Sequence, residues 1–119
     1  MEQHVLYGMV DIYQGPPAEP TLDEGRALQR LIAIAKRDSG QCKRVADFLL
    51  AWWNAESCGG FDLTDAWAVD KAIMQDMVVV FGMIARINKY PPELHPSLEP
   101  EFKDILHRWR PDLMRDESL

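Results

Sequence analysis

The sequence contains few cysteines and no long apolar run, and both shortages narrow the class of protein. Cys42 and Cys58 are the two cysteines among 119 residues, too few for a disulfide framework, and they form no CxxC pair. Free thiols of this kind are typical of a reducing compartment, so the sequence predicts a cytoplasmic protein. The most apolar run, residues 77–87, is shorter than the roughly 20 residues that span a membrane. No membrane association is expected.

Basic residues are also fewer than acidic residues. The chain has 13 Lys and Arg against 19 Asp and Glu, which gives a net charge of −6, and residues 1–25 contain no Lys or Arg at all. Contacts to phosphates provide most of the non-specific affinity for nucleic acid. An acidic chain therefore repels nucleic acid unless a local basic patch outweighs its net charge, and nucleic acid is not the expected partner.

What the sequence does contain is enough apolar residues for one packed domain. Hydrophobic residues make up 47% of the chain, and a chain of this length buries roughly two thirds of its unfolded surface. Prolines at positions 16, 17 and 20 exclude a regular element early in the chain. We therefore divide the chain into an N-terminal arm or linker (residues 1–20), a helical domain (21–111) and a polar tail (112–119).

Apolar residues recur with the helical period along the middle of the chain. Thr21 and Glu24 fit a capping box, in which each side chain accepts a hydrogen bond from the other's backbone N–H, and they mark the start of the first helix. Ser39-Gly40 is expected to end it. Further helices are expected over residues 41–55, 70–88 and 98–110, with one helical turn over residues 63–69.

The expected helix over residues 70–88 is apolar around most of its circumference. Its main stripe and the residues that widen it are Ile73, Met74, Met77, Val78, Val80, Phe81, Ile84 and Ala85. A helix of this kind is expected to be central, because few of its sides can face water. The sequence therefore predicts an all-α fold: a compact bundle of four to five helices around a central apolar helix, with an N-terminal arm.

The helix expected over residues 41–55 is apolar on two sides, with Leu50 and Trp53 lying off its main stripe. A two-sided helix is either sandwiched between neighbours or touches a partner. Trp53 and Trp67 fall cleanly on no stripe, and tryptophan is a residue type that anchors protein interfaces. Both are candidate partner-binding residues. The alternative is that they are partly buried and close a small core.

Two segments carry a resemblance to a known family. They are residues 44–67, which read RVADFLLAWWNAESCGGFDLTDAW, and residues 109–113, which read WRPDL. The chain resembles an uncharacterised family of small domains from proteobacterial integrative elements, plasmids and phages, over roughly residues 27–113. The resemblance implies a mobile-element setting and no established activity, and it assigns no catalytic residue.

Side chains that could carry chemistry are present but scattered. Zinc sites usually contain at least one close pair of ligands. The candidate ligands here are far apart in the sequence: His4, Cys42, Cys58, His95 and His107. No metal or other cofactor is expected. Cys58 lies at a predicted corner and could be exposed, but no histidine lies near it in the sequence to act as its base.

The acidic residues of the central region are expected to cap helices. Asp62 and Asp70 stand where elements begin, and Asp65 occupies the partner position of a cap. Asp76 is the exception, since it lies on a helix rich in Met and Val and is either on the one wet face or buried against an arginine. An acid–base site needs two carboxyl groups at a controlled separation, and no spacing here indicates one. We therefore expect no enzymatic activity.

Positive charge is most clustered between the first two expected helices. We call Lys36, Arg37, Lys43 and Arg44 the basic corner. Its layout is that of a helix-turn-helix, but the second helix is too apolar to read a DNA groove. An acidic patch on a protein partner fits the basic corner better.

These features indicate a non-catalytic protein-binding module that docks on a host complex or on a second copy of itself. With the mobile-element resemblance, an attractive special case is a stoichiometric inhibitor of a host defence system, similar to an anti-CRISPR protein. The alternative is a DNA-associated accessory or regulatory protein of the element that uses the basic corner. No small-molecule substrate is indicated.

Overall fold

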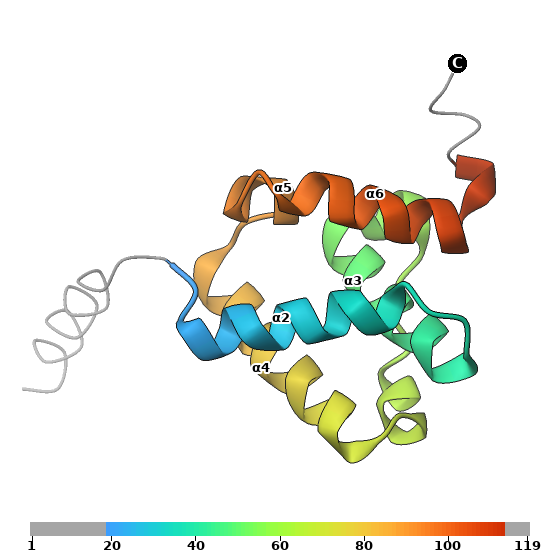
Figure 1. Cartoon of the computed structure of the whole chain (residues 1–119), viewed down its shortest axis with the longest axis horizontal. Helices are drawn as coiled ribbons and strands as arrows, with labels where there is room; N and C mark the ends of the chain where they lie inside the picture. Colours follow the sequence, from blue (N-terminus) through green and yellow to red (C-terminus); the bar gives the residue numbers. More distant parts are fainter. Residues whose placement is uncertain (1–18, 114–119) are drawn as a thin grey trace, which may run out of the picture.

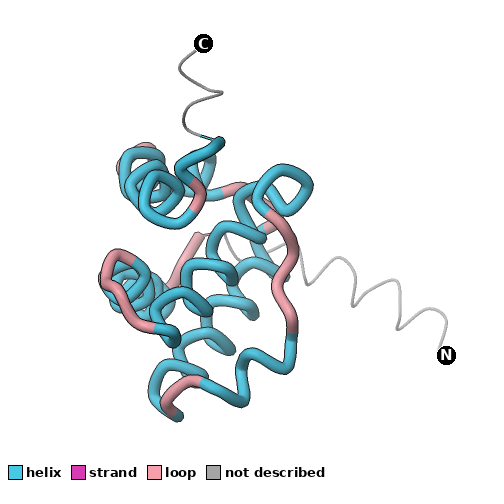
Figure 2. Tube along the Cα trace, turned by 90° about the vertical axis from the view of Figure 1, so that its right-hand side faces the viewer, coloured by secondary structure: helices cyan, strands magenta, loops and turns pink. Residues whose placement is uncertain are grey.

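Helices are the only regular secondary structure within residues 19–113, the part that the computed structural model describes (Figure 1). The elements are α2 (Leu22–Ala35), α3 (Gly40–Cys58), the 3₁₀ helix η1 (Leu63–Ala68), α4 (Lys71–Ile87), α5 (Pro91–Leu94) and α6 (Leu98–Trp109). Loops and turns connect each helix to the next, as Figure 2 shows. The predicted all-α fold is confirmed. The predicted arm and polar tail lie almost wholly outside residues 19–113.

α2 lies against three other helices. It contacts α3, α4 and α6, and Figure 1 shows it crossing the molecule between α6 above and α4 below. Its buried apolar residues include Leu28, Leu31, Ile32 and Ala35, which follow one another with the helical period. Ala27 and Ala35 carry small side chains at buried positions, and small residues at a contact let neighbouring helices approach closely.

The start of α2 is held to the end of α4. The predicted capping box is present, because the Thr21 hydroxyl accepts a hydrogen bond from the Glu24 N–H and the Glu24 carboxylate accepts one from the Thr21 N–H. The same carboxylate accepts two hydrogen bonds from the Arg86 guanidinium, at 2.6 and 2.7 Å. Arg86 also donates to the backbone carbonyl of Glu19. One carboxylate therefore starts α2 and ties it to α4.

α3 is buried on two sides and bends near its end. Val45, Leu49 and Leu50 are fully buried, and the helix packs against both α2 and α6. The sequence predicts an end at residue 55, but α3 continues to Cys58 after a kink at Asn54, whose φ of −163° and ψ of 83° are not helical. The Asn54 Oδ1 accepts a hydrogen bond from the Ser57 N–H at 3.1 Å. The asparagine thus caps one more helical turn.

α4 packs through one face, which differs from the prediction of a helix enclosed on most sides. Its buried residues follow the helical period and are Ile73, Met77, Val80, Met83 and Ile87. The prediction that Val78 and Phe81 belong to the core is wrong, because each is 61% exposed. Successive helical residues are rotated by about 100°, so Phe81 turns away from the face that buries Val80. Neither α4 nor any other helix within residues 19–113 is long and apolar enough to cross a membrane.

A short helix that the sequence does not predict joins α4 to α6. α4 ends at Asn88, which adopts the left-handed conformation with a φ of 63°. Proline suits the first turn of a helix, and α5 begins with the two prolines Pro91 and Pro92. α6 then buries Phe102, Ile105 and Leu106, which follow one another with the helical period.

Candidate protein-binding surfaces

Cys58 is buried and lacks the features of a catalytic thiol. It is the last residue of α3 rather than part of an exposed loop. Burial raises the pKa of the Cys58 thiol, and the nearby Arg110 guanidinium offsets only part of this shift. Because the thiolate is the reactive form of cysteine, a raised pKa makes Cys58 less reactive. Cys42 is also buried, and its sulfur accepts a hydrogen bond from the Ser39 hydroxyl at 3.0 Å.

Asp76 is paired with an arginine from another helix. Its carboxylate accepts two hydrogen bonds from Arg30 of α2, one from Nε and one from Nη2, both at 2.9 Å. The bidentate geometry explains why a carboxylate lies on this apolar helix. Of the two settings that the sequence leaves open for Asp76, the structure shows the pairing with arginine. Within residues 19–113, no three His, Cys, Asp or Glu side chains are grouped so that they could hold a metal ion.

The two other predicted caps differ in outcome. Asp62 caps η1, since its Oδ1 accepts hydrogen bonds from the Thr64 N–H and hydroxyl, and these bonds lower the pKa of Asp62. Asp70 is the N-cap residue of α4, as predicted, but its side chain forms no capping hydrogen bond. The Asp70 carboxylate accepts a hydrogen bond from the Gln41 amide group, and the Asp70 N–H donates to the same amide's oxygen. The paired hydrogen bonds with Gln41 therefore join the start of α4 to α3.

The basic corner is partly used within the fold, beginning with Lys36. Its ammonium group hydrogen-bonds to Glu101 of α6 and lies 3.6 Å from Asp104. The hydrogen bond to Glu101 is the main reason why the pKa of Lys36 is raised. Lys36 therefore joins α2 to α6. Arg37 differs, because its side chain is exposed and forms no ion pair with any residue that the structure describes.

Lys43 and Arg44, in the first turn of α3, also face carboxylates. Lys43 Nζ lies 3.0 Å from Asp47 Oδ2, one turn further along the helix. Arg44 Nε lies 3.6 Å from Asp65 Oδ1 of η1. Three of the four cations of the basic corner are thus balanced by acidic residues of the same chain, which weakens the positive potential that the corner presents to another molecule.

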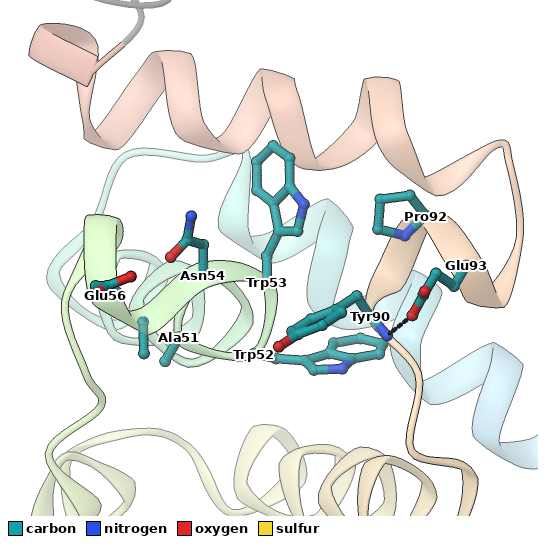
Figure 3. Close-up of a pocket in the computed structure, with 9 residues that line it drawn as sticks. Ala51, Trp52, Trp53, Asn54, Glu56, Tyr90, Pro92 and Glu93 are labelled. Carbon is teal, nitrogen blue, oxygen red and sulfur yellow. Dashed lines mark hydrogen bonds between the residues drawn. The ribbon is translucent and has the colours of Figure 1, made fainter.

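A groove of about 660 Å³ opens beside the kink of α3 (Figure 3). Aromatic rings and a proline line it, and carboxylates stand at its two ends. The residues named in this description are Trp52, Trp53, Glu56, Tyr90, Pro92 and Glu93. A groove with aromatic faces and acidic ends is suited to an extended segment with basic side chains.

The tryptophans of this groove also belong to the core. Trp52 and Trp53 each meet the fully buried ring of Phe102 edge to face, with centroids 5.7 and 5.9 Å apart. The Trp52 indole N–H donates a hydrogen bond to the Lys89 carbonyl at 3.0 Å. The position of Trp53 therefore agrees with the alternative of a partly buried tryptophan that closes the core.

Trp67 has the opposite setting, with 85% of its surface exposed on η1. It is one of seven large apolar side chains that are exposed among the described residues: Leu22, Leu63, Trp67, Val78, Val79, Phe81 and Tyr90. Three lie on α4, two on η1 directly before it, and Tyr90 shortly after its end. Leu22 adjoins the same end, because the ion pair between Glu24 and Arg86 holds the start of α2 there. All seven therefore lie on α4 or beside its ends.

The outward side of α4 forms a continuous apolar stripe. Met74, Val78, Phe81 and Ala85 follow one another at spacings of four, three and four residues, and we call these four side chains the α4 face. The sequence-based prediction missed this surface because it assigned the whole apolar stripe of α4 to the core. A usable signal was present, since α4 carries more apolar residues than a single helix face can bury.

The chain belongs to the family of unknown function DUF7673, whose model matches residues 25–110. The matched region runs from α2 to the end of α6 and leaves out the predicted arm. The resemblance to an uncharacterised family of small domains is thereby confirmed. No curated protein and no solved structure matches the chain.

Proposed function

We propose that the chain is a non-catalytic protein-binding module that docks through the α4 face. The observation that carries the proposal is the position of the seven exposed large apolar side chains on α4 or beside its ends. Scattered single apolar residues are normal on a protein surface, whereas a contiguous group is typical of an interaction site.

The character of the α4 face favours an apolar partner surface. Phe81 supplies an aromatic anchor in the middle of the stripe, and Trp67 supplies another beyond the N-terminal end of α4. Large aromatic side chains that become buried on binding provide much of the affinity of protein interfaces. Asp76 is the one acidic residue of α4, and it faces Arg30 instead of the α4 face. A partner would therefore meet little polar surface that has to be dehydrated.

Two finer proposals concern biological setting and partner. The resemblance of residues 44–67 and 109–113 supports a role in a bacterial mobile element. There, the module would act as a stoichiometric inhibitor that masks a surface of a host defence complex, as an anti-CRISPR protein does. An apolar face on a small helical domain suits masking, since masking requires only tight contact. The partner is a protein, either a host complex or a second copy of this chain.

The alternative of a DNA-associated protein is disfavoured by the contacts of the basic corner. Lys36, Lys43 and Arg44 face carboxylates of the chain itself, so a nucleic acid would have to displace or overcome them. Arg37 alone is a weak basis for phosphate binding, which relies on several cations acting together.

Binding through the α4 face can be tested by capture from host cells with three forms of the full chain. Wild-type protein and Arg37→Glu should retain the same protein, because Arg37 lies on the basic corner and away from the α4 face. Phe81→Lys should lose it while keeping its circular dichroism spectrum, since Phe81 is largely exposed. Capture that survives Phe81→Lys would contradict the proposal, and loss with Arg37→Glu alone would favour the basic corner.

A further inference from the structure

We infer that the occupant of the α4 face is a second copy of this chain, whose own α4 packs against it in antiparallel orientation. The inference rests on the proposed function and names the partner for that surface. Residue spacing, charge at the two ends of α4, one glycine and the position of the flanking apolar side chains support it independently of one another.

The α4 face has the residue spacing of a coiled-coil seam. Apolar residues that alternate by four and three positions keep one side of a helix toward a partner helix. Met74, Val78, Phe81 and Ala85 follow this rule, and it extends to Lys71 and Asn88 at the ends of the stripe. α4 contacts α2 and α3, and its buried residues lie on its other side, so within the described chain the seam has no partner.

Antiparallel pairing matches large residues with smaller ones in every apolar layer. With the twofold axis between residues 79 and 80, Val78 faces Phe81 of the second copy, and Met74 faces its Ala85. The same layers recur on the other side of the axis, as an isologous interface requires. Parallel pairing would instead place Phe81 on Phe81 and Ala85 on Ala85, which alternates crowded and underfilled layers.

Charge at the ends of α4 selects the same orientation. Asp70 precedes the helix and Lys89 follows it, and both are exposed. Antiparallel pairing brings each Asp70 toward Lys89 of the other copy, whereas parallel pairing brings like charges together. Lys71 lies in the first turn of α4, where the helix dipole disfavours a cation. In the antiparallel dimer it lies beside the C-terminal end of the other α4, where the dipole favours one.

Gly82 lies next to the α4 face, in the interior of the helix. A glycine there destabilises a helix relative to alanine, and a Cβ at position 82 would meet no atom within 4 Å. Packing inside the single chain therefore does not require glycine at this position. A second helix that crosses close to position 82 would require glycine there.

The flanking side chains enlarge the interface. A helix of 17 residues is about 25 Å long, and a stable interface buries about 800 Å² on each partner, so α4 alone falls short. Antiparallel pairing places Leu63 and Trp67, before one end of α4, near Leu22 and Tyr90 at the opposite end in the second copy. This arrangement adds the flanking apolar side chains to the paired α4 faces, whereas Val79, about 100° further round the helix than Val78, lies outside them.

The orientation can be tested with two single variants and their mixture. Val78→Glu and Phe81→Lys should each sediment as one chain of 13.7 kDa, whereas the wild type should sediment at twice that mass. An equimolar mixture of the variants should recover the doubled mass. In the antiparallel layer the new carboxylate at position 78 faces the new ammonium at position 81, and the second layer keeps its native Val and Phe. A parallel dimer would gain no such pair and would stay dissociated.

A disulfide trap gives an independent reading of the same geometry. Met74→Cys mixed with Ala85→Cys should form a crosslinked dimer when oxidised glutathione is added, because these positions share a layer. Met74→Cys alone should not, since it faces Ala85. The native Cys42 and Cys58 are 3% and 7% exposed and do not compete. Crosslinking of Met74→Cys with itself would overturn the antiparallel arrangement.

Two matched glycine variants separate packing from helix propensity. Gly82→Ala should weaken dimerisation, whereas Gly25→Ala on α2, where an added Cβ likewise meets no atom within 4 Å, should leave it unchanged. A wild type that sediments as a single chain at every concentration would overturn the inference. If Phe81→Lys still abolished capture of another protein in that case, the proposed function would stand with a different partner. The proposed function itself would fail if Phe81→Lys changed neither the capture of another protein nor the sedimentation of the chain.

Discussion

The ion pair between Glu24 and Arg86 should make the stability of the fold depend on pH in the acidic range. The informative change is Glu24→Gln. Glutamine also occupies the third position of capping boxes, so the variant keeps the hydrogen bond to the Thr21 N–H and removes the charge that faces Arg86. The measured difference then reports on the junction between α2 and α4 and leaves the helix start intact.

The expected magnitude follows from the electrostatics of Glu24. Its pKa is lowered from the ordinary 4.5 to about 2, chiefly by the hydrogen bond from Arg86, while burial opposes the shift and the Thr21 N–H adds to it. A shift of this size corresponds to roughly 3 kcal/mol. The Glu24 side chain is 12% exposed but that of Arg86 is 46% exposed. Solvent screening therefore reduces the expected loss of unfolding free energy at neutral pH to about 1–2 kcal/mol.

The sign of the pH dependence is fixed by the direction of the shift. Because the folded-state pKa of Glu24 lies below its unfolded value, the stabilisation is fully present above about pH 4.5 and is lost as the pH falls through about 2. Wild type and Glu24→Gln should therefore differ at neutral pH and converge near pH 2. Urea unfolding followed by tryptophan fluorescence measures this, since Trp52 and Trp53 pack on Phe102 in the core.

A matched control is available on α6. Glu99 lies 3.4 Å from Lys103, and both side chains are about half exposed, so Glu99→Gln should cost less than about 0.5 kcal/mol at any pH. Equal unfolding midpoints for wild type and Glu24→Gln at neutral pH would refute the reasoning. A loss of unfolding free energy near pH 2 that is as large as the loss at neutral pH would also refute it. Such a loss would show that the charge of Glu24 is not the cause.

Three further predictions concern the core, one loop and the thiols. Phe102→Ala should lower the free energy of unfolding by about 3–5 kcal/mol in urea titrations, because the ring is fully buried. Gly59→Ala should lower it by about 1–3 kcal/mol, since Gly59 has a φ of 95°, whereas its neighbour Gly60→Ala should be close to neutral in the same assay. Cys42 and Cys58 should react with a thiol reagent in urea and not in the native state, because both are buried.

Local features of the fold could be predicted from the sequence. The start of α2 depends on two residues three positions apart, Thr21 and Glu24, so its capping box is visible in the sequence alone. The buried residues of α6, including Phe102 and Ile105, follow from the helical period. The kink of α3 was not predictable in this way, because Asn54 ends one helical segment and begins the next without any proline or glycine to mark the place.

Contacts between distant segments decided the character of the candidate site. Lys36 meets Glu101 across 65 positions of the chain, and Arg30 meets Asp76 across 46. No local pattern reveals either pair. The basic corner looks like a cluster of free cations in the sequence, and only the packing of α2 against α6 shows that Lys36 is already engaged. For the same reason the sequence leaves open whether Asp76 faces water or an arginine, and it does not point to Arg30.

The two helices with apolar residues on more than one side carry the clearest lesson about function. Such a helix needs neighbours on each apolar side. α3 has them within the chain, because it packs against both α2 and α6 and its residues Leu49 and Leu50 are fully buried. α4 packs mainly on α2, and its second side, with Val78 and Phe81, is left to solvent. The sequence marks both helices as two-sided, and the missing neighbour of α4 is the reason to look for it in another molecule.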